Sequence, residues 1–165
     1  MPNAANATVQ SALTVGDAAP DFSMPANGGA HVSLAGLKGK NIVLYFYPKD
    51  DTPGCTLEGK DFSTMKEAFA AANAEIIGVS KDSVASHEKF CAKFDYTILL
   101  ASDEGSDVCE SYGVWVEKNM YGKKYMGIER ATFLIDGNGK LAKIWRKVKV
   151  EGHAEEVLKA VHTLA

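Results

Sequence analysis

Three cysteines are the residues of this chain best suited to redox chemistry: Cys55, Cys91 and Cys109. Cys55 follows a proline-containing loop, residues 48–54, and stands where a helix is expected to begin. At a helix N-terminus the unpaired backbone N–H groups and the macrodipole favour an anion, so a thiolate is expected there at neutral pH. The position predicts a nucleophilic thiol, although a free cysteine can also be an inert buried side chain.

Hydrophobic patterning predicts the elements that hold this loop. Residues 41–47, reading NIVLYFY, form a continuous β-branched and aromatic run, which is typical of a strand buried on both faces. Residues 56–72 carry apolar side chains at helical intervals and predict an amphipathic helix. Further strands are expected over residues 75–79, 97–100, 131–135 and 141–150, and further helices over residues 83–94 (N-capped by Asp82), 107–112 and 153–164.

The order of these elements predicts an α/β fold. Strands alternate with helices and are followed by a hairpin around residues 136–139, so we expect a central mixed β-sheet flanked by helices on both faces, with right-handed crossovers. An N-terminal β-hairpin is expected over residues 22–34. A thioredoxin-like fold fits this order. We expect residues 1–12 to be a flexible tail and residues 13–165 to form a single domain.

Composition excludes several classes of function. The chain has 165 residues and a net charge of -3, which argues against a nucleic-acid-binding surface. No apolar run approaches the length of a membrane span, and the N-terminal residues do not read as a signal peptide. An odd number of cysteines fits reducing surroundings. We therefore expect a cytoplasmic protein with no nucleic-acid or membrane partner.

Motifs for cofactors and metals are missing from the sequence. There is no phosphate-binding glycine loop and no C-x-x-C pair, and the four histidines lack metal-ligand spacing. The segment of residues 136–140 begins like a calcium loop, but Lys140 stands where an oxygen ligand is needed. No cofactor and no metal are expected.

The Cys55 loop carries a specific motif. Pro48, Thr52 and Cys55 form the pattern P-x-x-x-T-x-x-C within YFYPKDDTPGCTLEG. This stretch resembles the peroxiredoxins, and among them the bacterioferritin comigratory protein or peroxiredoxin Q subfamily. The likeness continues through VGDAAPDF, GVSKDS, NMYGKKYMGIERATFLID and WRKVKV, and so covers nearly all of the chain after residue 12.

The resemblance implies a role for each residue around the thiol. Cys55 would be the peroxidatic thiolate, Thr52 would hydrogen-bond the peroxide, Pro48 would shield the sulfur from water, and Arg130 would supply positive charge. The alternative for Arg130 is a surface cation before a strand.

Two further residues, Glu58 and Gly54, are expected to act on this group without touching the peroxide. Glu58 would orient Arg130, or would be an acid favoured in the first turn of a helix. Gly54, which directly precedes Cys55, is expected to support the site together with Glu58.

The resemblance also implies a resolving thiol. Some subfamily members place it five residues after the peroxidatic cysteine, but here that residue is Lys60. The segment SHEKFCAKF resembles members that carry it in a later helix, which implies an intramolecular disulfide between Cys55 and Cys91; the alternative is that Cys91 is a core residue. Cys109 is interpreted as structural. We also hypothesise that Gly59 eases unwinding of the helix after Cys55, because glycine weakens helices.

The implied function is an atypical two-cysteine peroxidase that reduces hydrogen peroxide and organic hydroperoxides and is itself reduced by thioredoxin, as a monomer. Two alternatives remain. A protein disulfide oxidoreductase would want C-x-x-C where this loop reads T-P-G-C. A redox-sensing or chaperone module could use Cys55 as a noncatalytic switch.

Overall fold

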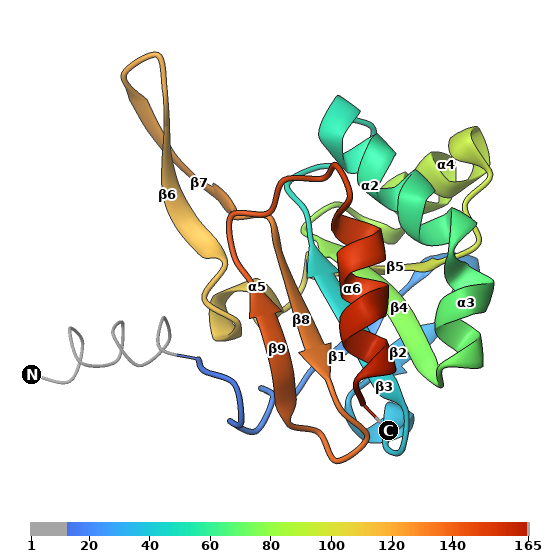
Figure 1. The fold of residues 1–165 in the computed structure, drawn as a ribbon. Coiled ribbons are helices and arrows are strands. Elements are labelled where there is room, and N and C mark those ends of the chain that lie inside the picture. The colour runs from blue at the N-terminus through green and yellow to red at the C-terminus, as the bar shows by residue number, and fades with distance from the viewer. Residues whose placement is uncertain (1–12, 165) are drawn as a thin grey trace, which may run out of the picture.

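The computed structural model describes residues 13–164, which are built around one five-stranded mixed sheet (Figure 1). The strand order is β5-β4-β3-β8-β9, with β3, β4 and β5 parallel and with β8 and β9 antiparallel to their neighbours. The strands are β3 (Asn41–Phe46), β4 (Ala74–Ser80), β5 (Leu99–Ser102), β8 (Ala131–Ile135) and β9 (Leu141–Trp145). The predicted α/β class and mixed sheet are confirmed.

Strand β3 occupies the centre of the sheet. Each of its six residues is buried, as its continuous apolar run predicts. Both of its edges are hydrogen-bonded, one to β4 and the other to β8. The Cys55 loop therefore leaves the sheet from its central, fully buried strand.

Helices cover one face of the sheet, as Figure 1 shows. They are α2 (Pro53–Thr64), α3 (Lys66–Ala71), α4 (Val84–Phe94) and α6 (His153–His162). The chain moves from β3 to β4 to β5 in one direction across the sheet, so successive right-handed crossovers place their helices on the same side. Both α2 and α4 consequently lie on this face.

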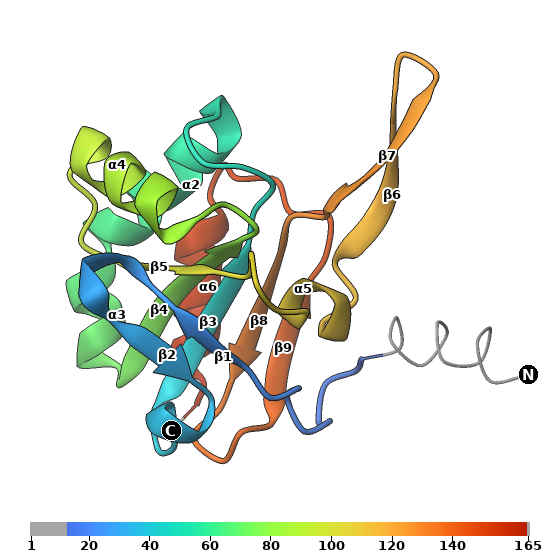
Figure 2. The ribbon, with the colours of Figure 1, turned by 180° about the vertical axis from the view of Figure 1, so that it is seen from behind.

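The opposite face is covered mainly by strands (Figure 2), so the expectation of helices on both faces is wrong apart from one short helix. The expected N-terminal hairpin is present as β1 (Ser23–Pro25) and β2 (His31–Ser33), joined by the short 3-10 helix η1 (Asn27–Gly29). A second 3-10 turn, η2 (Ala35–Leu37), follows, and the one-turn helix α5 (Val108–Ser111) packs beside the hairpin.

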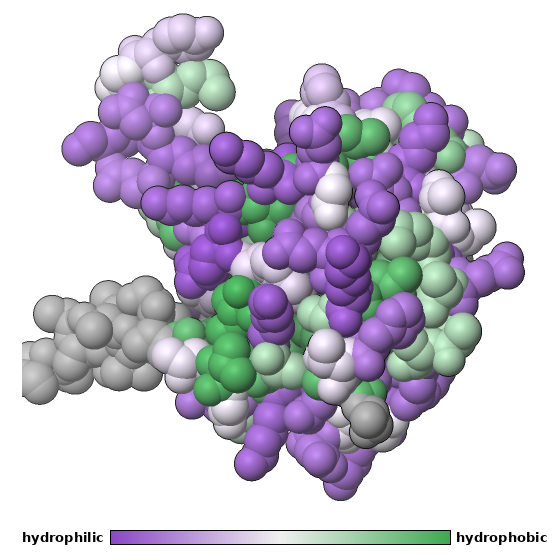
Figure 3. Space-filling view, viewed as in Figure 1, coloured by the Kyte–Doolittle hydropathy of each residue, from purple (hydrophilic) through white to green (hydrophobic). Residues whose placement is uncertain are grey.

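A third hairpin, besides β1–β2 and the expected β8–β9 hairpin, was not predicted. Strands β6 (Trp115–Met120) and β7 (Lys123–Ile128) pair with each other and project from the body as an arm (Figure 1). Tyr121 and Gly122 both have positive φ at its tip, as a two-residue type I′ turn requires. Much of the arm is exposed, and its surface is mainly hydrophilic in Figure 3, so the pattern of one buried face that marks most strands is weak here.

Several predicted boundaries are wrong. The helix expected over residues 56–72 begins earlier, at Pro53, and is interrupted at Met65. The strand expected over residues 97–100 lies at Leu99–Ser102, and β9 ends at Trp145 rather than at residue 150. The N-cap of α4 is Ser83, whose side chain accepts from the Ser86 N–H. The carboxylate of Asp82 is instead bound to the Asp50 N–H and the Ser80 hydroxyl.

The tail expected over residues 1–12 lies outside the described residues. Within residues 13–164 we find no helix with the length and apolar content needed to cross a bilayer.

Candidate active site around Cys55

Cys55 lies in the first turn of α2. Thr52 is the N-cap and Pro53 opens the helix, so the first intrahelical bond runs from the Thr56 N–H to the Thr52 carbonyl, 2.8 Å. The backbone N–H groups that precede Thr56, including that of Cys55, have no intrahelical partner and point toward the helix N-terminus. The side chain of Cys55 is only 2% exposed. The thiol is therefore shielded from water but sits at the positive end of a helix dipole.

Arg130 contacts the Cys55 sulfur, although 75 positions separate the two residues in the sequence. It lies between β7 and β8, and its Nη2 atom is 3.4 Å from Cys55 Sγ. Burial alone would lower the pKa of Arg130, but the neighbouring Glu58 and Cys55 raise it above its usual value. A permanently charged guanidinium thus faces the sulfur, where it stabilises a thiolate.

Glu58 holds the other arm of the guanidinium. Its Oε1 atom accepts from Arg130 Nη1 at 2.6 Å, and the carboxyl is almost fully buried. Burial raises the pKa of Glu58 to about 7, against the opposing effect of Arg130. Among the described residues no donor reaches Glu58 Oε2, which favours the protonated form further. Because α2 begins at Pro53, Glu58 is not a first-turn acid, and that alternative is wrong.

The remaining predicted residues lie in the loop and the helix start. The Thr52 hydroxyl donates to the Lys49 carbonyl at 2.9 Å, which leaves its oxygen lone pairs free to accept. Gly54 stands under the guanidinium, because a Cβ at this residue would lie 3.0 Å from Arg130 Nη2. Pro48 is exposed at the start of the loop. The structure therefore brings Arg130 into contact with Cys55, and Gly54 and Glu58 into contact with Arg130.

Cys91 lies on α4, on the same face of the sheet as Cys55, and both are free thiols. Burial first, then the carboxylates of Asp50 and Glu88, raise the pKa of Cys91 to about 11. The Asn27 amide donates to its sulfur at 3.4 Å. In this conformation Cys91 is a protonated and poorly nucleophilic thiol.

Cys109 belongs to the other face of the sheet and is fully buried. Burial, followed by the Asp103 carboxylate, raises its pKa well above the usual thiol value. This environment suits the structural interpretation of Cys109.

Two groups near the site were missed by sequence analysis. Asp50, in the Cys55 loop, binds His87 of α4 through a buried contact of 2.7 Å. Tyr96, just after α4, reaches back to α2 and its hydroxyl donates to the Thr56 carbonyl at 2.5 Å. Asp50 lies inside the loop motif and could have been singled out there, whereas nothing in the sequence pattern marks Tyr96.

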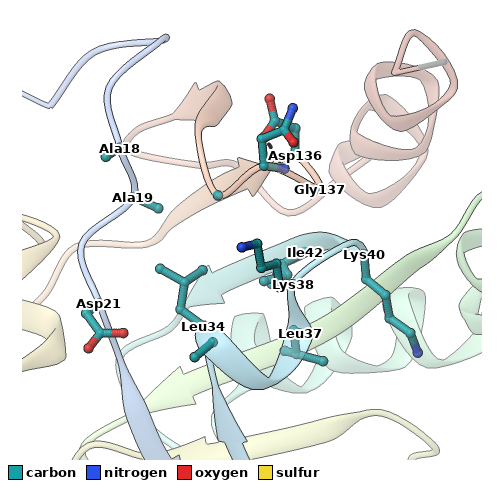
Figure 4. Close-up of a pocket in the computed structure, with 13 residues that line it drawn as sticks. Ala18, Ala19, Asp21, Leu34, Leu37, Lys38, Lys40, Ile42, Asp136 and Gly137 are labelled. Atoms are coloured by element: carbon teal, nitrogen blue, oxygen red, sulfur yellow. Dashed lines mark hydrogen bonds between the residues drawn. The ribbon is translucent and has the colours of Figure 1, made fainter.

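A separate hollow of about 270 Å³ lies away from the thiol. Figure 4 shows part of its lining, namely Leu34 and Leu37 after β2, Ala18 and Ala19 before β1, and Asp136 and Gly137 from the β8–β9 turn. It also contacts Ile42 at the start of β3, whereas the Cys55 loop follows the end of that strand. The hollow is therefore at the opposite end of the sheet from the candidate site.

Comparison with protein families gives a match over most of this chain. Residues 15–144 match the model of the AhpC/TSA family. A putative peroxiredoxin bcp of Coxiella burnetii is 50% identical over 146 residues, covering 88% of this chain and 97% of that protein. Peroxiredoxin Bcp of Bacillus subtilis is 48% identical over 153 residues, covering 93% of this chain and 98% of that protein.

Solved structures agree with these relatives. Xanthomonas campestris peroxiredoxin Q superposes with a TM-score of 0.84 at 46% identity, covering 93% of this chain and 98% of that one. A structure of the bacterioferritin comigratory protein of the same organism, described in terms of its alkyl peroxide reduction activity, gives 0.83 at 45% identity over the same shares. These neighbours confirm the thioredoxin-like fold.

Proposed function

Because the chain belongs to the AhpC/TSA family, and within the peroxiredoxins to the bacterioferritin comigratory protein group, we propose that it is a thiol peroxidase whose peroxidatic residue is Cys55. One observation carries this assignment: the guanidinium of Arg130 stands 3.4 Å from a thiol in the first turn of a helix. Both the guanidinium and the helix dipole favour the thiolate, which is the nucleophilic form.

The first step oxidises Cys55. The thiolate attacks one oxygen of the hydroperoxide, the S–O bond forms as the O–O bond breaks, and sulfur becomes a sulfenic acid. The second oxygen leaves with its electron pair, takes a proton and departs as an alcohol, or as water from hydrogen peroxide. Arg130 stabilises the charge that develops on this leaving oxygen.

Thr52 and Pro48 complete the peroxide site. The Thr52 hydroxyl already donates to the Lys49 carbonyl, so it accepts a hydrogen bond from the protonated peroxide oxygen. Pro48 covers the approach to the sulfur and limits water there. Glu58 and Gly54 act on Arg130, one by binding its Nη1 and the other by leaving room for its Nη2.

The second step uses Cys91. Its sulfur attacks the Cys55 sulfenic acid, the S–S bond forms as the S–O bond breaks, and the hydroxyl leaves with the thiol proton as water. A disulfide requires Cα atoms within about 7 Å, so parts of α2 and α4 unwind to let the two buried thiols meet. A thioredoxin then supplies two electrons and two protons and restores both thiols.

The substrate and setting follow from the same family. The alkyl peroxide reduction described for the X. campestris protein supports organic hydroperoxides, together with hydrogen peroxide, as substrates here. We place the enzyme in the cytoplasm as a monomer, the state in which thioredoxin can reach the disulfide without a partner chain in the way.

The test is peroxide consumption coupled to thioredoxin and its reductase. Replacing Cys55 with serine should abolish turnover, and a Cys55→Ser protein that keeps full turnover would overturn the proposal. A peptide map of peroxide-treated protein should show a Cys55–Cys91 disulfide. A Cys55–Cys109 link would reassign the resolving residue.

A further inference from the structure

A buried carboxylate joins the Cys55 loop to helix α4. Asp50 lies in this loop and its side chain is 4% exposed. Its Oδ2 atom accepts from the Ser86 hydroxyl at 2.8 Å and lies 2.7 Å from His87 Nδ1. Its Oδ1 atom accepts from the Tyr47 hydroxyl at 2.5 Å. Two of these three contacts therefore come from α4.

His87 is held at both ring nitrogens. Nδ1 faces the Asp50 carboxylate, and Nε2 lies 2.9 Å from the carbonyl oxygen of Ala101 on β5. The His87 side chain is 0% exposed, so water cannot replace either contact. Removing the ring would leave the buried Asp50 carboxylate and the Ala101 carbonyl without these partners, which is costly.

The contact between Asp50 and His87 acts on the part of α4 that carries Cys91. Cys91 follows His87 by four residues, so the two side chains lie on one face of the helix, one turn apart. Figures 1 and 2 both show α4 beside α2 at this end of the molecule. The turn before Cys91 is thus fastened to the Cys55 loop and to β5, while Cys91 itself is held by a weaker amide–sulfur contact.

We propose that Asp50 is a positioning residue for the resolution step. Its bonds to α4 hold Cys91 away from Cys55 while peroxide reacts, and their release limits the rate of disulfide formation. This inference rests on the proposed function, in which these two thiols form the disulfide.

The same release activates the resolving thiol. Burial and the Asp50 carboxylate are the two largest reasons why the pKa of Cys91 is raised to about 11. When α4 moves away, Cys91 enters water and leaves this carboxylate behind, so both effects end together. Cys91 therefore becomes a good nucleophile only when the helix has been freed.

The first test variant is Ser86→Ala, which deletes one donor to Asp50 and keeps the backbone N–H that Ser83 caps. Rapid quenching with a thiol-alkylating reagent and mass spectrometry would follow sulfenic acid and disulfide separately in the full chain. We expect disulfide formation to accelerate by a factor of up to roughly ten, the value of one ordinary hydrogen bond. The rate of Cys55 with hydrogen peroxide should stay unchanged.

The second variant, His87→Gln, removes the ring that joins Asp50 to β5. The control is Ser106→Ala, which deletes a hydroxyl donor to another buried carboxylate, that of Asp103, on the opposite face of the sheet. Loss of stability without faster resolution is expected for Ser106→Ala, whereas His87→Gln should resolve faster than Ser86→Ala. If His87→Gln does not fold, Ser86→Ala against Ser106→Ala decides the question.

The outcomes separate this inference from the function on which it rests. Equal resolution rates in Ser86→Ala, Ser106→Ala and the unaltered protein, with a Cys55–Cys91 disulfide formed in all, would overturn the role of Asp50 alone. Equal acceleration in the test and control variants would also overturn it, because general destabilisation would then be the cause. The absence of that disulfide from the unaltered protein would instead overturn the proposed resolving residue.

Discussion

The ring of Tyr96 packs directly against the backbone of Gly59. A Cβ at Gly59 would lie 2.7 Å from Tyr96 Cε2 and 2.9 Å from its hydroxyl oxygen. That hydroxyl in turn binds the Thr56 carbonyl in the first turns of α2. Residue 59 must therefore be a glycine to leave room for the Tyr96 ring. This requirement is separate from the weakening of the helix that we inferred from the sequence.

This contact reverses the expected effect of Gly59→Ala. Helix propensity alone predicts a gain of about 1 kcal/mol, but overlap with the ring predicts a loss of about 1–3 kcal/mol in the free energy of unfolding. Urea denaturation would measure it. Gly105→Ala is the control, since nothing lies within 4 Å of a Cβ there and its expected change is within about 0.5 kcal/mol. A stabilised Gly59→Ala protein would mean that the ring moves aside freely.

The unwinding hypothesis for Gly59 needs kinetic data as well. If Gly59→Ala leaves the rate of disulfide formation unchanged, glycine at this position does not aid resolution. Tyr96→Phe isolates the other contribution, because it removes only the hydrogen bond to Thr56 and keeps the ring.

Arg130→Gln should slow the reaction of Cys55 with peroxide by about 10²- to 10³-fold, the usual cost of losing one donor to a developing oxyanion. Arg130→Lys keeps the charge but cannot bridge Cys55 and Glu58 with two nitrogens, so we expect an intermediate rate. Stopped-flow kinetics would give both second-order rate constants. Arg146→Gln, which breaks an ion pair with Glu129, is the matched control and should react at the unaltered rate.

Glu58 should make stability depend on pH. Its pKa rises from a usual value of 4.5 to about 7 on folding, so between these values the folded state binds the proton more tightly than the unfolded state. The favourable contribution is complete below about pH 4.5 and is lost as the pH rises through about 7. The Glu58→Gln side chain cannot ionise, so this variant avoids the loss in the free energy of unfolding, which is at most about 3 kcal/mol.

Denaturation curves at several pH values would test this expectation. The stability of Glu58→Gln relative to the unaltered protein should increase from about pH 5 to about pH 7 and level off above it. Parallel profiles for the two proteins would contradict a raised Glu58 pKa.

Cys91→Ser should separate the two halves of the cycle. The reaction of Cys55 with the first equivalent of peroxide is expected to keep its rate, because Cys91 is buried and takes no part in that step. Turnover with thioredoxin should fall to near zero, and a sulfenic-acid probe should label Cys55. Cys109→Ala, on the other face of the sheet, should keep its turnover. Full turnover in Cys91→Ser would reassign the resolving residue.

The parts of the fold that sequence predicts are those with one dominant pattern. Strand β3 is apolar throughout and buried throughout, and the Cys55 loop carries a motif with fixed spacing. The β6–β7 arm was missed because most of its residues are at least partly exposed, and burial is what produces a strand pattern. The break at Met65 was missed because apolar spacing continues across it.

The candidate site was predictable only where residues lie close together in the sequence. The family resemblance supplied Arg130, which is 75 residues from Cys55, and no local pattern would have paired them. Asp50 contacts His87, and Tyr96 contacts Gly59. In each pair the two residues are 37 positions apart in the sequence and belong to different elements. Such pairs depend on how the crossovers stack their helices, which periodicity does not specify.

The proposed mechanism affects the two faces of the sheet differently. The core on the β1–β2 side contains neither Cys55 nor Cys91, and Cys109 is packed within it. In that mechanism, unwinding of α2 and α4 would leave this layer and the five strands assembled, as a template on which the freed segments rewind after reduction. Each catalytic cycle would then be a short refolding reaction on a preformed scaffold, confined to one layer of the protein.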